Sequence, residues 1–147
     1  MNMSLKFPLR IATIGATLAA SLFLAACATP GTSAMQKLTP EQMQKRAAER
    51  STARWKALTD KRFSEAFGYL SEASRTGVTA NEYGGAMQRM GYLAANLTGV
   101  SCDDTVCTVR STVTLPIYVR NVGARPQDIS VEELWTLQNG ELWLIRR

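Results

Sequence analysis

The chain has 147 residues, a length that suits one domain, with 17 Lys and Arg, 12 Asp and Glu and no His. The absence of His excludes His general bases, Cys-His and Ser-His dyads and His-ligated metals within the chain. The net charge of +5 is mild and the basic residues are scattered among acids, so no nucleic-acid partner is expected.

Residues 1–26 have the pattern of a secretory signal peptide. Lys6 and Arg10 lie in a short basic segment, and residues 11–26 are uncharged and rich in Ile, Leu and Ala. As a helix, residues 11–26 would rise only about 24 Å, which is less than the ~30 Å hydrocarbon core of a bilayer. This stretch therefore favours a cleaved leader over a permanent transmembrane anchor.

The leader ends Leu24-Ala25-Ala26-Cys27. This motif resembles the lipobox of bacterial lipoproteins, in which two small residues precede a thiol that accepts a diacylglyceryl group. The resemblance implies cleavage before Cys27 and a lipid anchor on that cysteine, and so membrane attachment in the cell envelope. In a bacterium with two membranes, Ala28 resembles the pattern for export to the outer membrane, facing the periplasm, because retention at the inner membrane usually has Asp there. The alternative is a plain secretory cut that leaves Cys27 as an ordinary thiol.

Residues 27–38 contain Pro, Gly, Ser and Thr without periodicity, which predicts a flexible tether before a domain at residues 39–147. Thr39 and Gln42 have the spacing of a capping box, with Pro40 at the first helical position. The buried face of this first helix is predicted to consist of Met43, Ala47, Ser51, Trp55 and Leu58.

Two further helices are expected. One follows Asp60 and buries Phe63, Ala66, Phe67 and Leu70. Residues 71–77 are predicted to be a loop. Thr79 and Glu82 form a second capping box, and the third helix ends at Gly91.

After residue 91 the apolar period changes to two, which predicts antiparallel strands. Apolar side chains alternate with Thr and Arg from Val109 to Val119, and Pro116 places the end of that strand at an edge or a bulge. Residues 121–127 are predicted to be a loop, and a tight hairpin turn is expected at residues 139–140. The four predicted strands are 92–101, 107–119, 128–138 and 141–146.

Cys102 and Cys107 bracket a short polar turn. In an oxidising compartment this spacing predicts a disulfide, worth about 2 kcal/mol because the closed loop is small. A metal pair and a redox pair are the alternatives, but two thiols without His make a poor metal site. A redox pair normally has the Cys-x-x-Cys spacing at a helix start. No metal site and no cofactor are expected.

Three helices followed by a curved antiparallel sheet resemble the nuclear-transport-factor-2-like, or SnoaL-like, α+β cone. The segments that carry the resemblance are residues 54–58 (RWKAL), 62–71 (RFSEAFGYLS) and 134–145 (LWTLQNGELWLI). It covers about residues 40–146 and implies an α+β fold with three N-terminal helices on a curved antiparallel sheet of about four strands. Such a fold hosts enzymes, binding modules and assembly domains, so it implies no single function.

Enzymes of the fold that this chain resembles use His-Asp or Asp-Arg-Asp catalytic sets, or a pocket Asp that acts as a base together with a Tyr and a second acid. The chain has no His, and Asp103 and Asp104 lie in a predicted turn rather than in a pocket. We therefore expect a non-catalytic envelope lipoprotein that binds another envelope protein or a small apolar ligand. The alternative is a cell-envelope enzyme that uses a pocket carboxylate.

The turn at residues 139–140 would place Glu133 opposite Arg146 and Trp135 opposite Leu144. Glu133 could then be a pocket carboxylate for a cationic or hydroxylated ligand, beside Trp135. The second interpretation, which we favour, is a cross-strand ion pair between Glu133 and Arg146 with Trp135 in the core.

The other face of this hairpin has Leu134, Trp143 and Ile145. Because three helices can cover only one face of the sheet, these residues are expected to face solvent and to form an interface. The predicted partner is a second copy of the chain or another protein. The alternative is that another segment of the same chain covers them.

Overall fold

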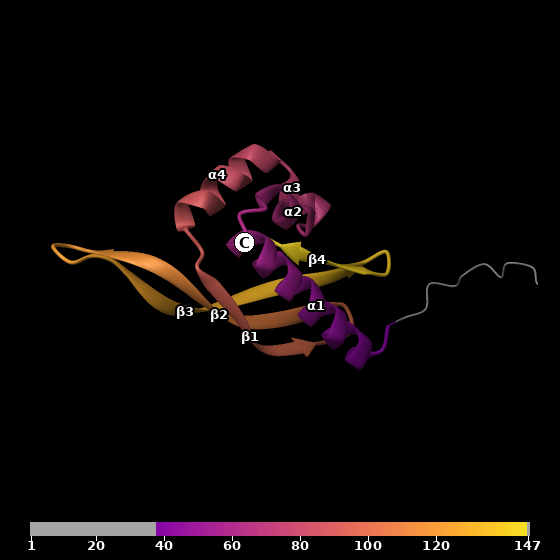
Figure 1. Cartoon of the computed structure of the whole chain (residues 1–147). Coiled ribbons are helices and arrows are strands. Elements are labelled where there is room, and N and C mark those ends of the chain that lie inside the picture. The colour runs from indigo at the N-terminus through magenta and orange to yellow at the C-terminus, as the bar shows by residue number, and fades with distance from the viewer. Residues whose placement is uncertain (1–37, 147) are drawn as a thin grey trace, which may run out of the picture. The chain divides into compact units, whose positions relative to one another are not determined.

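The computed structural model describes residues 38–146, in which a layer of helices lies on an antiparallel sheet with strand order β1-β2-β3-β4 (Figure 1). The predicted α+β class, with N-terminal helices on a four-stranded antiparallel sheet, is confirmed. In chain order the elements are α1 (Pro40–Thr59), α2 (Phe63–Gly68), α3 (Glu72–Arg75), α4 (Ala80–Met90), β1 (Ala94–Cys102), β2 (Val106–Val119), β3 (Gly123–Gln138) and β4 (Glu141–Ile145).

Side-chain caps fix where the two longer helices begin, as the sequence predicts. The Thr39 hydroxyl accepts a hydrogen bond from the backbone of Gln42, whose side chain accepts from the backbone of Thr39, and Thr79 and Glu82 do the same for α4. Gly91 ends α4 in the left-handed region, at φ 67°, where a side chain would be strained. The five residues predicted for the inner face of α1 are all buried.

Two segments predicted to be loops are more ordered than expected. Residues 71–77 contain α3, because the Ser71 hydroxyl caps the backbone N–H of Ser74. The loop predicted at residues 121–127 is wrong, because β3 already begins at Gly123. Asn121 and Gly123 have positive φ angles and make a tight turn, so the residues that follow pair with β2.

The ladder between β2 and β3 is longer than the rest of the sheet. The first paired residue of β1, Ala94, lies opposite Thr114, so β2 and β3 continue without a third strand beyond that point. Figure 1 shows this two-stranded hairpin projecting past the helices. Pro116 lies opposite Pro126 in the projecting part, where neither residue needs to donate to a neighbouring strand. The expected edge position of Pro116 is therefore confirmed.

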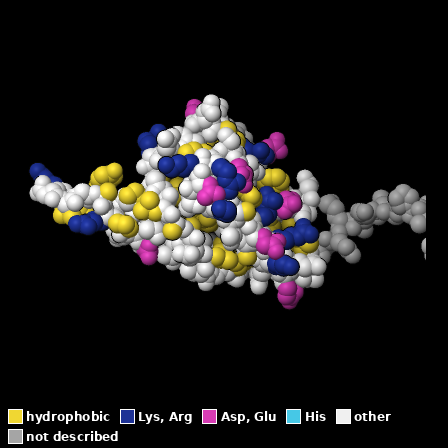
Figure 2. Space-filling view, viewed as in Figure 1, with side chains coloured by type: hydrophobic (Ala, Val, Ile, Leu, Met, Phe, Trp, Pro, Cys, Tyr) yellow, Lys and Arg dark blue, Asp and Glu magenta, His cyan; other side chains and the backbone are white. Residues whose placement is uncertain are grey.

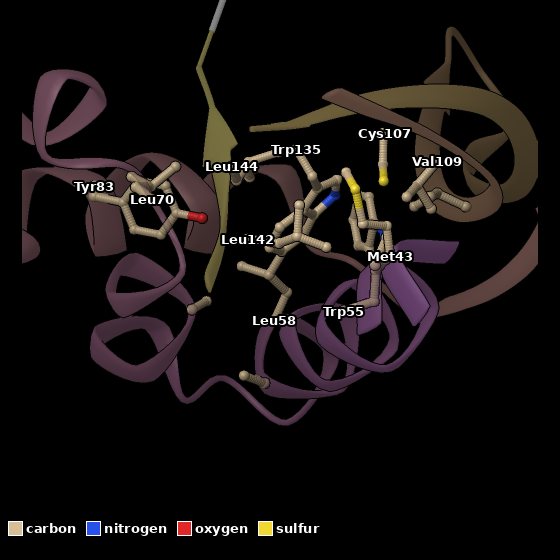
Figure 3. Close-up of a cluster of buried hydrophobic side chains, with 14 of the residues drawn as sticks. Met43, Trp55, Leu58, Leu70, Tyr83, Cys107, Val109, Trp135, Leu142 and Leu144 are labelled. Atoms are coloured by element: carbon tan, nitrogen blue, oxygen red, sulfur yellow. The ribbon is translucent and has the colours of Figure 1, made fainter. Parts of the chain in front are cut away.

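The core lies between α1 and the covered part of the sheet (Figure 3). Alternate residues of β2 face it, and Val109 and Val113 have no exposed surface. Besides these, the largest fully buried side chains are Trp135, Met43, Leu58, Leu70 and Leu142.

The free edge of β4 is closed by the chain between α2 and α3. Leu70 forms an isolated parallel bridge with Leu144. The backbone N–H of Ser71 donates to Leu144 at 2.9 Å, and the N–H of Leu144 donates to Tyr69 at 2.9 Å. These bonds hold the C-terminal strand against the helices and so position the pocket described next.

Candidate functional site

A pocket of about 290 Å³ opens between the helices and the last two strands. Its volume is near the lower end of the range for small-molecule sites, roughly 300–1,000 Å³. Most of its wall is apolar or aromatic, with charged groups at a few positions. The lining residues are Arg54, Trp55, Leu70, Tyr83, Ala86, Met87, Tyr92, Val131, Glu132, Glu133, Leu134, Leu144, Ile145 and Arg146.

A buried ion pair joins α1 to β3 beside this pocket. The Arg54 guanidinium donates to Glu133, and both residues are almost fully buried, at 7% and 5% exposure. Ser51, one helical turn before Arg54, donates to the same carboxylate at 2.5 Å, and the Trp135 indole donates to it at 3.3 Å. Three donors thus satisfy the Glu133 carboxylate, which a buried charge requires.

Two tyrosines extend this polar group along the wall. Arg54 Nη2 donates to the Tyr83 hydroxyl at 3.2 Å. The Tyr92 hydroxyl donates to the sulfur of Met87 at 3.6 Å, and the Tyr92 ring meets Trp55 edge-on at 5.5 Å. Burial raises the pKa of Tyr92 above its ordinary value, so its hydroxyl keeps its proton and stays a donor at neutral pH.

The charges of the pocket wall are largely neutralised within the protein. Glu133 is paired with Arg54, and Glu132 is paired with Arg110 at 3.4 Å. Arg146 also lines the pocket, is exposed, and forms no ion pair with another residue in the range 38–146. Its backbone N–H donates to the Ser74 hydroxyl at 2.8 Å, which fixes the strand end at the pocket. The pocket therefore has a neutral interior with one cation at its rim.

The structure corrects the partner predicted for Glu133. The register of β3 and β4 is the predicted one, with Trp135 opposite Leu144, but Glu133 pairs with Arg54 of α1 instead of Arg146. The ladder ends at Ile145, and Arg146 turns to α3. Because α1 packs over β3, it brings Arg54 closer to Glu133 than β4 brings Arg146, and Arg54 is the more buried of the two cations. Trp135 is fully buried, as the core interpretation expected.

Arg54 is the site residue that the sequence analysis missed. It lies three residues after Ser51 and one before Trp55, at the margin of the predicted buried face of α1. An Arg at the margin of a buried helix face needs a counter-charge, and the chain has a Glu at an inward position of a predicted strand. These two features together were the available signal for the ion pair. Local pairing rules did not detect it, because Arg54 and Glu133 are far apart in sequence.

The predicted interface residues are half-buried instead of facing solvent. The Trp143 ring lies under two cations, with the guanidinium carbon of Arg50 at 5.0 Å and that of Arg75 at 5.9 Å from its centroid. Leu134 and Ile145 are also half-buried and line the pocket. The helices reach around the edge of the short strand β4, which the sequence analysis did not anticipate. An interface through these three residues stays a prediction.

The predicted disulfide is confirmed. Cys102 and Cys107 face each other at the end of the β1–β2 ladder and are bonded, with their Cα atoms 4.0 Å apart. Asp103 organises the turn between them by accepting hydrogen bonds from the backbone of Thr105 and Val106 at 2.9 and 2.8 Å. These bonds lower the pKa of Asp103.

The predicted lipidation site is not covered by the structure. Cys27, the predicted signal peptide at residues 1–26 and all of the predicted tether except Leu38 lie outside the described residues. Within residues 38–146, none of the helices has the length and hydropathy to cross a membrane. The same range contains no group of three His, Cys, Asp or Glu side chains placed to hold a metal ion.

Known proteins are similar to this chain at the level of fold. No family and no curated protein matches its sequence. The solution structure of a SEC-C motif containing protein from Rhodopseudomonas palustris has a TM-score of 0.54 and 15% identity, covering 66% of this chain and 73% of that one. The crystal structure of a Campylobacter jejuni protein described as an NTF2-like transpeptidase has a TM-score of 0.46 and 10% identity, covering 69% and 98%.

At 15% identity the first likeness shows a shared fold alone, and the second is weaker still. The helices on a four-stranded antiparallel sheet are consistent with the predicted cone. Membership in the nuclear-transport-factor-2-like family remains a prediction.

Proposed function

We propose that this chain is an envelope lipoprotein whose α+β domain binds a small, largely apolar ligand with a neutral or anionic oxygen-bearing head. The proposal is carried by the charge arrangement of the pocket, in which the interior charges neutralise each other and Arg146 at the rim has no ion-pair partner among residues 38–146. An apolar body would lie against Met87, Val131 and Leu144, and its head would meet Arg146 and the Tyr92 hydroxyl.

The same arrangement argues against a cationic ligand. Glu133 would be the group to attract one, but its carboxylate already accepts hydrogen bonds from Arg54, Ser51 and Trp135. A ligand cation would have to displace a buried guanidinium, which would then lack a counter-charge. A carboxylate occupied in this way is also not free to contact a substrate, which favours binding as the role of the pocket.

Three ten-carbon probes that differ in their heads test the ligand class: decanoate, decanol and decyltrimethylammonium. Calorimetric titration is expected to give affinity in that order, with little binding of the ammonium. Arg146→Ala is expected to weaken decanoate by roughly three- to tenfold and to leave decanol nearly unchanged, because the lost interaction is a partly exposed charge-assisted contact. Arg89→Ala, an exposed Arg on α4 that does not line the pocket, is the matched control.

A second pair of variants tests whether the probes enter the pocket at all. Ala86→Trp fills the pocket from α4 while both members of the ion pair are kept, and is expected to abolish binding of both decanoate and decanol. Asn81→Trp adds the same bulk at an exposed position of the same helix and is expected to have no effect. Tightest binding of the ammonium probe, or equal losses in both Trp variants, would contradict the proposed ligand class.

The envelope part of the proposal is supported by Leu24-Ala25-Ala26-Cys27 behind a basic leader. Radiolabelled palmitate is expected to enter the wild-type protein and not Cys27→Ser, and the labelled form is expected to fractionate with the outer membrane. An unlabelled, soluble wild-type form would show that Cys27 is an ordinary thiol.

A further inference from the structure

The end of the β2–β3 hairpin, residues 115–127, projects past the helices beyond its buried base at Leu115 and has an unusual surface. We call this segment the hairpin tip. Four of its large apolar side chains are exposed: Ile117 at 39%, Tyr118 at 82%, Val119 at 46% and Val122 at 52%. They account for more than half of the seven exposed large hydrophobic residues found among residues 38–146. A grouping of this kind on an isolated ribbon marks a contact surface.

The apolar residues of the hairpin tip lie on both faces of the ribbon. Successive side chains of a strand point to opposite faces, so Ile117 and Val119 share one face and Tyr118 lies on the other. The register places Tyr118 opposite Ala124, which adds another apolar group to the second face. A flat protein surface would cover one face and leave the other in water. A bilayer surrounds an inserted ribbon on all sides.

The charges of the hairpin tip have one sign. Arg120 and Arg125 are its only charged residues, and residues 115–127 contain no Asp or Glu. Asp128, the first acid beyond it, accepts a hydrogen bond from the Thr114 hydroxyl at 2.6 Å. Figure 2 shows hydrophobic and basic side chains together on this projection, whereas basic and acidic side chains are mixed over the body of the domain.

Arginine combines a long apolar stem with a head that bonds phosphate, so it can remain at the surface of a membrane while its stem lies deeper. Tyr likewise has an apolar ring and a polar hydroxyl, and is enriched where hydrocarbon meets water. Two Arg among Ile, Tyr and Val therefore match the chemistry of an anionic lipid headgroup layer better than that of an acidic protein surface, which would leave the apolar groups uncovered.

We propose that the hairpin tip inserts into the headgroup region of an anionic membrane. Tyr118, Val119 and Val122 lie at the acyl boundary, and Arg120 and Arg125 contact lipid phosphates. This inference is independent of the ligand pocket. It gives the domain a membrane contact at the end of the sheet away from residue 38, which lies beside the β1–β2 turn.

The test measures the depth of two matched positions in the full-length protein, reconstituted in phosphatidylcholine vesicles with or without phosphatidylglycerol. Tyr118→Trp reports the hairpin tip, and Gln138→Trp reports an exposed position at the other end of β3. Brominated lipids, which quench Trp emission at short range, are expected to quench Trp at 118 and not at 138, after subtraction of the unsubstituted protein. Both variants have the same N-terminal segment and the same Cys27, so the difference between them does not depend on lipidation.

Charge variants then test the role of the headgroups. Each of Arg120→Glu and Arg125→Glu is expected to lower the ratio of quenched to unquenched emission at 118 by roughly fivefold in phosphatidylglycerol vesicles. Arg89→Glu, an exposed Arg on α4, is the control and is expected to have no effect. All three positions are exposed, so circular dichroism is expected to show unchanged folding.

The proposal is overturned if 118 and 138 are quenched equally, if quenching is the same without phosphatidylglycerol, or if the Arg120 and Arg125 variants match the control. It is also overturned if ultracentrifugation shows a dimer that Val119→Asp dissociates while Trp at 118 stays unquenched. That result would assign the hairpin tip to a second copy of the chain.

Discussion

The two halves of the β2–β3 ladder have the same alternating pattern but different surroundings. In the covered half, Val109 and Val113 are fully buried and Glu133 has a partner on α1. In the projecting half, Ile117 and Val119 continue the same period but are exposed. The comparison shows that alternation indicates which residues share a face, while the helical layer determines whether that face is buried.

The largest expected effect comes from the buried ion pair. Glu133→Ala is expected to lower the free energy of unfolding by about 3–5 kcal/mol, because it leaves the Arg54 charge buried without a counter-charge. Urea unfolding measures this loss. A double variant, Arg54→Met with Glu133→Leu, is expected to recover most of it, since the charge and its counter-charge are removed together. A double variant as unstable as Glu133→Ala would mean that the hydrogen bonds of Ser51 and Trp135 dominate.

A pair of truncations sharpens the comparison between the two halves. Leu142→Ala removes a fully buried side chain and is expected to cost about 2–5 kcal/mol of unfolding free energy. Val119→Ala, in the hairpin tip, is expected to cost less than about 0.5 kcal/mol because the side chain is largely in water. Both follow from urea unfolding of the lipid-free protein. A loss at Val119 comparable to that at Leu142 would show that the hairpin tip is packed against something in solution.

Removing the disulfide is expected to have an intermediate effect. Cys102→Ala with Cys107→Ala should lower the unfolding free energy by about 2 kcal/mol, because a short closed loop removes little entropy from the unfolded chain. The unfolding midpoints of oxidised wild type and the double Ala variant give the value. The wild type unfolded without reductant is expected to show neither thiol to alkylating reagents, and two reactive thiols would refute the bridge.

The smallest expected effect is a pH dependence of stability that differs between the turns at the two ends of β2. Backbone hydrogen bonds lower the pKa of Asp103 in the folded protein, so this carboxylate stabilises the fold above its ordinary pKa. The stabilisation is lost as the pH falls through the lowered, folded value. Unfolding midpoints of wild type and Asp103→Asn are expected to differ slightly at neutral pH and to converge in acid. Arg120 lies in a turn without acids, so the difference in unfolding midpoint between wild type and Arg120→Gln is expected not to shrink in acid.

Local signals were enough to predict much of this fold. The capping boxes at Thr39 and Thr79, the buried face of α1 and the cysteine pair depend on neighbours within a few residues, and the structure confirms them. The tight turn at Gly123 was missed, because Pro126 suggested a loop and its partner Pro116 was considered only as the end of a strand.

The candidate site depended on contacts that local signals do not contain. Glu133 was identified as unusual, but its partner Arg54 comes from a helix whose placement over β3 depends on packing of the whole core. Trp143 was expected to be exposed because the alternation of β4 assigned it to the outer face. Arg50 and Arg75 cover it from the helices, and their reach depends on β4 being a short edge strand.

The bridge between Leu70 and Leu144 has a consequence for the behaviour of the protein at high concentration. A free strand edge can recruit a strand from another molecule, and such recruitment can propagate into aggregates. The Tyr69–Ser71 segment occupies the edge of β4. The opposite edge strand, β1, is irregular between Leu97 and Gly99, which interrupts the straight row of donors and acceptors that a recruited strand would need. In the body of the domain, the outer edges of β4 and β1 are therefore protected against growth by strand addition.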